Sequence, residues 1–351
     1  MNRKKIEKNY IYKFCAVLLF CMAFLSGCGE KKLETTTLFA MDTIMELQIV
    51  GDPKLLTEAE GKIRNIEKLI SVTDEDSDIY NLNRSSTYEV SGITADIMDK
   101  ALTMCGRTEG ALDISIYPVL KAWGFTTGEY QVPTEEELSI LTKNVDYRQV
   151  SLNKNGSDNT FTATIPEEMQ VDLGSVAKGY TSTMLSDYFR ENGVKSGLIN
   201  LGGNVQCIGT KTDGSLWKVA IKSPFPDSSS GIYGVLEAAD TAIITSGGYE
   251  RYFEQDGQIY WHIIDPVTGR PAHAGLSSVT VVGSDGIVCD ALSTALFVKG
   301  LEESVRLWQA SSDFEAIFIT EDGEVYITEG IADSFSLSSE YHSAPVHVLT
   351  K

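Results

Sequence analysis

Hydrophobic residues recur at helical spacing in several segments of the chain. Within residues 53–70, Leu56, Ile63 and Ile66 fall on one side of a helix. Residues typical of helix ends mark other boundaries, among them a Thr with Glu three positions later, which is the signature of a capping box. The predicted helices cover residues 53–70, a segment from Thr94 to near Gly110, a segment that begins at Thr134 with Glu137, residues 176–192 before Gly193, and about 287–298.

Alternating polar and apolar residues predict strands, most of them in the second half of the chain. Residues 37–50 alternate as one strand. Further strands are expected in GLINLGGNVQCIG, WKVAIKSP, AIITSGGYERYF, QIYWHIIDP and SSVTVVG, and a last hairpin turns at residues 321–323. Because helices and strands alternate without a strict βαβ order, we expect an α+β fold of mixed helices and mainly antiparallel sheets, built as one large domain or two lobes.

The first 28 residues have the layout of an export signal. Five basic residues precede an apolar run over residues 14–25, and Leu-Ser-Gly-Cys at 25–28 resembles a bacterial lipobox. We expect a signal peptide at residues 1–27, a linker at 28–36 carrying lipid on Cys28, and a folded domain at 37–345. The expected location is the outer face of the cytoplasmic membrane, held by the lipid alone. The alternative is a short uncleaved anchor.

The charge of the chain limits its partners. Residues 1–27 hold five basic residues and one acidic residue, so their removal changes the net charge from −20 to −24. This acidic balance argues against nucleic acid as a partner, and it indicates that an anionic ligand would bind together with a metal ion. Beyond Cys28 the remaining cysteines are Cys105, Cys207 and Cys289, whose number and spacing suggest buried small side chains rather than disulfides or a zinc site.

A Gly-rich segment, DLGSVAKG at residues 172–179, leads into the helix at 176–192. The start of such a helix offers free N–H groups and a dipole that favours an anion, and Ser175 and Lys178 add a hydroxyl and a cation. The spacing matches neither a Walker A loop nor the dinucleotide fingerprint. An ordinary strand-to-helix turn with a solvated Lys178 remains the alternative.

Three further segments carry candidate chemistry. In VCDALSTALF, Asp290, Ser293 and Thr294 share one helix face, and oxygen ligands of this kind suit Mg²⁺; an N-cap Asp290 followed by ordinary helix hydroxyls is the alternative. In YWHIIDPVTGRPA, His262 ends a predicted strand and is a candidate general base or a structural histidine. Trp123, in ALDISIYPVLKAWGF, is suited either to stacking on a flat ring or to the core.

The order of these segments resembles the ApbE family. FAMDT, DSDIYNLN, GALDISIYPVLKAWGF, VDLGSVAKGY, GLINLGGN, TSGGYERYF, HIIDPVTGRP and CDALSTALFVKG follow one another from about residue 39 to residue 300. The resemblance implies an ApbE-like, T-fold-related architecture. It also implies an exported, Mg²⁺-dependent FAD:protein FMN transferase, which moves FMN from FAD to a Ser or Thr hydroxyl of a protein and releases AMP.

The resemblance also implies roles for individual residues. Mg²⁺ would be held by Ser175, Asp290 and Thr294, and His262 and Asp290 would be the catalytic pair, with His262 assisting deprotonation of the acceptor hydroxyl. Arg251 would help to neutralise phosphate. The FAD site would be lined by Met41, Ala111, Leu112, Asp113, Asp172, Lys178 and Ile264. The chain departs from the family pattern at three positions. It has Asp42 where many members have Gly, Thr73 where some relatives have Tyr, and Ser293 where some relatives have Asp.

The acceptor is expected to be another protein. Relatives modify a signature like Asp-x-x-Ser/Thr-Gly-Ala-Ser/Thr, which this chain lacks. By family resemblance the partners are flavin-accepting extracytoplasmic domains of membrane redox complexes, Rnf-like or Nqr-like. An FAD pyrophosphatase, which uses water in place of the hydroxyl, and a non-catalytic flavin-binding lipoprotein are the competing readings.

Overall fold

The computed structural model describes residues 32–156 and 160–351. The predicted signal peptide, Cys28 and the first linker residues lie outside these ranges. In the described part of the chain, strands form one nine-stranded sheet in the order β1-β2-β6-β7-β10-β13-β14-β15-β17. Their bounds are β1 Leu33–Ala40, β2 Thr43–Val50, β6 Gly197–Leu201, β7 Asn204–Ile208, β10 Ala242–Gly247, β13 Leu276–Gly283, β14 Phe314–Thr320, β15 Val325–Thr328 and β17 Val346–Leu349.

Smaller sheets and the helices surround this central sheet. The sheets are β8 Trp217–Lys222 with β9 Ile232–Ala238 and β16 Phe335–Leu337, β11 Tyr252–Gln255 with β12 Gln258–Trp261, and β3 Thr87–Ser91 with β5 Thr160–Thr164 and β4 Ser151–Lys154. The helices are α2 Lys54–Ile70, α3 Asp78–Ser85, α4 Gly92–Arg107, α5 Tyr117–Ala122, α6 Glu135–Leu141, α7 Gly174–Glu191 and α8 Gly286–Gln309. The pairing is antiparallel except between β15 and β17, which confirms the expected α+β class.

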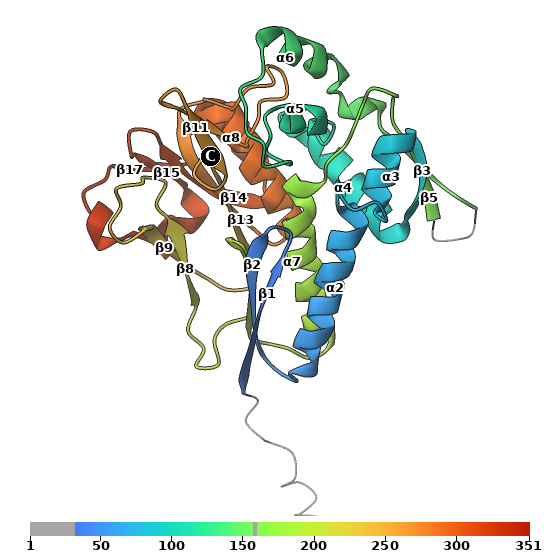
Figure 1. The fold of residues 1–351 in the computed structure, drawn as a ribbon. Coiled ribbons are helices and arrows are strands. Elements are labelled where there is room, and N and C mark those ends of the chain that lie inside the picture. The colour runs from blue at the N-terminus through green and yellow to red at the C-terminus, as the bar shows by residue number, and fades with distance from the viewer. Residues whose placement is uncertain (1–31, 157–159) are drawn as a thin grey trace, which may run out of the picture.

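The central sheet separates two layers of core. Successive side chains on a strand point to opposite faces, so Ile244 and Val281 pack with the helices, whereas their neighbours Ile243 and Val282 pack with β8 and β9. Figure 1 shows α2, α4 and α7 on one side of the sheet and β8–β9 on the other. Both faces of the sheet are therefore covered along its central strands β7, β10, β13 and β14.

Residues 37–50, predicted as one strand, form a hairpin instead. Met41 and Asp42 have φ of 47° and 59° and make a two-residue turn between β1 and β2. The buried positions change parity across the turn, from Leu38 and Ala40 to Met45, Leu47 and Ile49. The sequence alternates through residues 37–50 and has no Gly or Pro at the turn, so it gives no sign that the chain reverses there. The hairpin starts at Leu33, inside the expected linker.

Several helix boundaries also differ from the predictions. Ser91, not Thr94, caps α4; Thr94 instead donates its hydroxyl to Asp78 Oδ2 at 2.6 Å. Helix α7 starts at Gly174, and α8 continues past a kink at Gly300 to Gln309. Helices α3 and α5 were not predicted, and neither was β17, which extends the sheet beyond the expected domain end at 345.

Other expectations are confirmed. Thr134 and Glu137 form a reciprocal capping box at the start of α6, and β14 and β15 make the last hairpin. Cys105, Cys207 and Cys289 are buried free thiols. Among the described residues, none of the helices combines the length and apolar character needed to cross a membrane.

The closest helix crossing gives a stability test. In Gly179→Ala, the new Cβ would lie 2.3 Å from the Gly286 carbonyl oxygen and 2.5 Å from Asp290 Cβ. Because backbone must move, we expect the free energy of unfolding to fall by about 1–3 kcal/mol. The control Gly61→Ala has nothing within 4 Å of its new Cβ and should gain about 0.5–1 kcal/mol. Urea unfolding measures both; equal stability of the two variants would contradict the close crossing.

Candidate functional site

The start of α7 is fixed by a buried turn. The backbone N–H of Asp172 donates to the Ile114 carbonyl at 2.8 Å, and Asp172 Oδ1 accepts from Gly174 N–H at 2.6 Å. Leu173 is the N-cap residue and contributes no side-chain cap. The N–H groups of Gly174 and Val176 already donate to Asp172 and to the Leu173 carbonyl, so the N–H of Ser175 is the one in the first turn left for a ligand. Burial raises the pKa of Asp172, and the Gly174 N–H and the charges of Arg251 and Lys178 oppose that rise.

Asp290 lies where α7 and α8 cross. Its side chain is buried, and Oδ2 accepts from the backbone N–H of Gly179 at 2.7 Å. Burial raises the Asp290 pKa, while the Lys178 charge, the Gly179 N–H and the Asn204 side chain oppose the rise. The N-cap of α8 is Asp285, so the reading of Asp290 as a capping residue is wrong. The crossing places a buried carboxylate beside the lysine of the Gly-rich segment.

Hydroxyl groups continue from Asp290 along α8. Ser293 Oγ donates to the Asp290 carbonyl at 2.9 Å and lies 2.8 Å from Ser246 Oγ. Ser246, at the end of β10, also lies 3.3 Å from Thr294 Oγ1. Ser293 is fully buried and held by these contacts, whereas Thr294 is only partly buried. Thr294 is therefore the better placed of the two to meet a ligand.

His262 directly follows β12 and has a defined tautomer. Its Nδ1 lies 3.1 Å from the Arg251 carbonyl oxygen. A carbonyl only accepts, so Nδ1 carries the proton and Nε2 presents a lone pair. Burial, followed by the charges of Arg251 and Lys178, lowers the pKa of His262 to about 4. The imidazole is therefore neutral at physiological pH.

The tip of the β1–β2 hairpin closes one side of this cluster. Asp42 Oδ2 lies 3.9 Å from Arg251 Nη2, and the Met41 N–H donates to Glu67 Oε1 at 2.6 Å. Figure 1 shows the tip pointing toward the N-terminal end of α7. Asp42 thus faces the same arginine that the resemblance assigns to phosphate.

Asp113 occupies a separate, structural position. Oδ1 accepts from the N–H and the hydroxyl of Ser115 at 2.8 and 2.6 Å, and Oδ2 accepts from Tyr147 N–H at 3.0 Å. Burial raises its pKa against these hydrogen bonds. Asp113 borders a cavity of about 640 Å³ that Lys143 and Arg148 also line. Its carboxylate fixes the wall of that cavity.

The structure brings together only some of the residues singled out from the sequence. The charge of Lys178 acts on Asp172, His262 and Asp290, and the charge of Arg251 acts on Asp172 and His262. Others are packing residues: Leu112 is in the core beneath the helices, and Ile264 packs with Trp123. Ala111 is partly buried against the same core as Leu112, and Ser175 lies partly buried in the first turn of α7.

Trp123 belongs to the core rather than to a stacking platform. It is fully buried, and its indole N–H donates to the Gly269 carbonyl at 2.7 Å. Sequence reasoning missed two residues of the cluster, Asn204 beside Asp290 and Ser246 beside Thr294. Both lie in segments already noted, NLGGN and TSGG, but a lone amide and a lone hydroxyl give no signal of their own.

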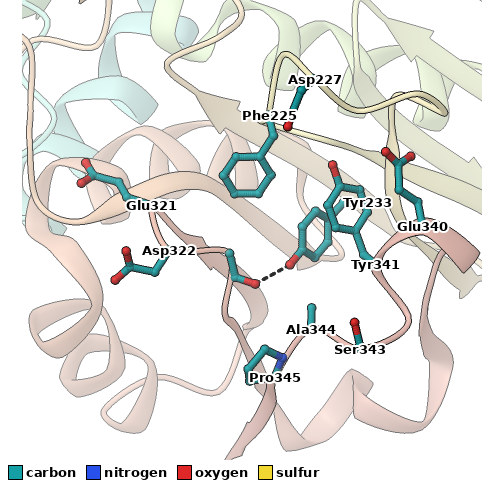
Figure 2. A pocket seen from close by; sticks show the side chains of 11 residues that line it. Phe225, Asp227, Tyr233, Glu321, Asp322, Glu340, Tyr341, Ser343, Ala344 and Pro345 are labelled. Atoms are coloured by element: carbon teal, nitrogen blue, oxygen red, sulfur yellow. Dashed lines mark hydrogen bonds between the residues drawn. The ribbon is translucent and has the colours of Figure 1, made fainter.

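A second cavity, of about 430 Å³, is lined by residues of the second half of the chain and is shown in Figure 2. Phe225 and the stacked rings of Tyr233 and Tyr341, 4.2 Å apart, form its aromatic wall. Among the described residues that line it, four are acidic, and none is Lys or Arg. The acidic residues are Asp227, Glu321, Asp322 and Glu340. An anionic diphosphate would be repelled there, so this cavity is a poor candidate for a phosphate site.

Known proteins resemble the chain over most of its length. A family model described as the ApbE family matches residues 41–318. The FAD:protein FMN transferase of Vibrio cholerae is 33% identical over 317 residues, which cover 87% of this chain and 91% of the relative. The FAD:protein FMN transferase of Treponema pallidum is 31% identical over 350 residues, covering 93% and 96%.

Solved structures share the fold. The ApbE protein of Thermotoga maritima matches with a TM-score of 0.79 at 28% identity, covering 86% of this chain and 99% of its own. The flavin transferase ApbE from Vibrio cholerae matches with a TM-score of 0.74 at 30% identity, covering 86% and 100%. The arrangement of helices and mainly antiparallel sheets is thus the one those proteins adopt.

The electrostatics of the cluster predict an unusual histidine. In NMR titration of the four histidines, we expect His262 to protonate near pH 4. Arg251→Gln should raise that midpoint but leave it below the ordinary value of 6.5, because burial, the larger cause, remains. The exposed control Arg190→Gln should leave it unchanged. Since the folded-state pKa is lowered, His262 contributes stability above pH 6.5 that is lost as the pH falls through about 4. A midpoint near 6.5 would contradict the burial.

Proposed function

The chain belongs to the ApbE family, and from this premise we propose that it is a flavin transferase, which moves FMN from FAD to a Ser or Thr hydroxyl of an acceptor protein. The observation that carries the proposal is that Asp290 is buried against the Gly-rich segment, with Oδ2 accepting from the Gly179 N–H at 2.7 Å. The charge of Lys178 in that segment acts on both Asp290 and His262. Cleaving a diphosphate requires charge stabilisation on its oxygens and a deprotonated hydroxyl to attack. The cluster supplies groups suited to both tasks.

The reaction balances with one proton transfer. The acceptor oxygen forms a bond to the FMN phosphorus, and its proton passes to Nε2 of His262. The bond from that phosphorus to the bridging oxygen breaks, and the electron pair leaves with AMP. Lys178, Arg251 and the N–H of Ser175 at the start of α7 stabilise the negative charge on the phosphate oxygens. The product is a phosphoester between FMN and the acceptor side chain.

His262 becomes a stronger base when the substrate binds. With a pKa of about 4, His262 is unprotonated before FAD binds, as a general base must be, but it is then a weak base. Two of the causes of that low pKa are the charges of Arg251 and Lys178. A bound diphosphate neutralises those charges and raises the pKa toward its ordinary value, which favours proton abstraction only when FAD is in place.

The donor set at Asp290 fits Mg²⁺. Its carboxylate, with the hydroxyls of Thr294 and Ser175, would hold the ion, because oxygen ligands are those that Mg²⁺ prefers. Within the described residues no three His, Cys, Asp or Glu side chains form a metal cluster, so waters and substrate oxygens would complete the ligand set. When bound, the ion supplies positive charge to the diphosphate. The buried Asp290, with its raised pKa, would thereby gain a counter-charge.

The remaining family-assigned residues would shape the FAD site. Met41 at the hairpin tip and Asp172 border the charged cluster, while Asp113 fixes the wall of the 640 Å³ cavity. Ala111, Leu112 and Ile264 contribute through packing. In this arrangement the diphosphate lies at the start of α7.

We also place the protein outside the cell, in keeping with the signal and lipobox pattern of residues 1–28. Lipid on Cys28 would hold it at the outer face of the cytoplasmic membrane. The acceptors would then be extracytoplasmic flavin-carrying domains of membrane redox complexes.

The first test follows the product. A form beginning at Gly29 is incubated with FAD, Mg²⁺ and a domain carrying the Asp-x-x-Ser/Thr-Gly-Ala-Ser/Thr signature, and the intact mass of that domain is measured. We expect a gain equal to FMN, one AMP released per transfer, and no gain with EDTA. Free FMN with AMP would indicate a hydrolase, and FAD recovered whole would indicate a flavin-binding protein; either result contradicts the transferase.

Asp290→Asn tests the buried carboxylate. The change keeps the size of the side chain but removes its charge, so we expect transfer to fall by roughly 100-fold or more with an unchanged melting temperature. Asp187→Asn, at an exposed residue of α7, the helix that crosses α8 at Asp290, should transfer normally. Normal transfer by a folded Asp290→Asn protein would remove Asp290 from the mechanism.

His262→Ala tests the base. We expect the rate at saturating substrates to fall by roughly 100-fold to 10,000-fold, while the dissociation constant for FAD changes little. Stopped-flow transfer and FAD fluorescence measure the two quantities. A fall in FAD affinity with an unchanged rate would instead make His262 a binding residue.

A further inference from the structure

The turn at the end of helix α5 fixes the position of Phe125. Gly124 has a φ of 82°, and its N–H donates to the Lys121 carbonyl at 3.0 Å. The N–H of Phe125 donates to the Leu120 carbonyl at 3.0 Å, so the two hydrogen bonds form a Schellman motif. A Cβ on Gly124 would lie 2.1 Å from the Glu129 carbonyl oxygen, so the turn requires glycine. The backbone of Phe125 is therefore held in place, and its side chain is 4% exposed.

Phe125 contacts both Arg251 and His262. Its ring centroid lies 6.4 Å from that of the His262 imidazole, in an edge-on arrangement with 66° between the ring planes. Its carbonyl oxygen accepts a hydrogen bond from Nη1 of Arg251 at 3.4 Å. The Arg251 carbonyl in turn accepts from the backbone N–H and from Nδ1 of His262, each at 3.1 Å. The three residues therefore form a closed set of contacts, in which each touches the other two.

The ring of Phe125 also belongs to an aromatic cluster. Its centroid lies 5.8 Å from the ring of Tyr130 and 5.8 Å from that of Phe253, and Phe253 stacks on Tyr260 at 5.2 Å. Among the described rings of this cluster, Phe125 is the one paired with His262. The other rings hold Phe125 from behind, so it can act as a rigid support for the imidazole.

We propose that Phe125 is a positioning residue for FMN transfer, whose ring holds the plane of the His262 imidazole and whose carbonyl holds the Arg251 side chain. The proposal rests on the proposed transferase function and adds a residue that acts through His262 rather than on the substrate. The Nδ1 hydrogen bond fixes the tautomer of the imidazole, and the edge-on ring contact restricts its tilt. The same ring keeps water from the imidazole, which matters because burial is the main cause of the low pKa of His262.

The test removes the ring and keeps an apolar side chain. Phe125→Leu retains the backbone carbonyl that binds Arg251. The charges of Arg251 and Lys178, which act on His262, stay in place. We expect the transfer rate at saturating FAD and acceptor to fall by roughly tenfold or more, with both KM values within about twofold of the wild type. In NMR titration without FAD or Mg²⁺, the His262 midpoint should rise from about 4 toward 6.5, by roughly one pH unit.

Phe253→Leu is the matched control, because it makes the same change in a ring that packs on Phe125; it should keep the wild-type rate and midpoint. Melting temperatures verify folding, and Phe125→Met repeats the test if Phe125→Leu is unfolded. An unchanged rate or midpoint in the folded Phe125 variant, or equal changes in Phe253→Leu, would overturn the positioning role while leaving the transferase intact. If the wild type transfers no FMN, the proposed function fails, and the titration still reports whether the ring covers His262. The two failures are thereby distinguishable.

Discussion

The site depends on the close approach of helices α7 and α8. Gly179 allows it, because a Cβ there would meet the Gly286 carbonyl at 2.3 Å. At this contact the Gly179 N–H donates to Asp290 at 2.7 Å, so one hydrogen bond joins the Gly-rich segment to the carboxylate 111 residues later. The helix crossing thus sets where Lys178 and Asp290 lie, and the loops from the sheet add Arg251 and His262 to them.

The cluster reconciles an acidic protein with an anionic substrate. The chain carries a net charge of −20, yet the charges of Lys178 and Arg251 help to lower the pKa of His262 and oppose the rise in the pKa of Asp172. Local placement of two cations at a helix start matters more for a diphosphate than the overall charge. The same field links substrate binding to the basicity of His262.

The backbone around the candidate site differs from the sequence prediction in several places. The DLGSVAKG and CDALSTALF segments carry residue types whose spacing on a helix is informative, and the structure brings Lys178 and Asp290 together. The hairpin at residues 33–50 was missed because its turn, Met41 and Asp42, lacks the glycine that usually marks positive φ. Ser246 and Asn204 were missed because their roles come from tertiary contacts, which no local pattern records.

The position of the FAD diphosphate tests the central claim most directly. A crystal structure with FAD and Mg²⁺ would give that position. We predict the diphosphate at the start of α7, between Lys178 and Asp290, with Nε2 of His262 facing the FMN phosphorus from the side opposite AMP. A diphosphate bound away from Lys178 and Asp290, with neither residue in contact with it, would contradict the account.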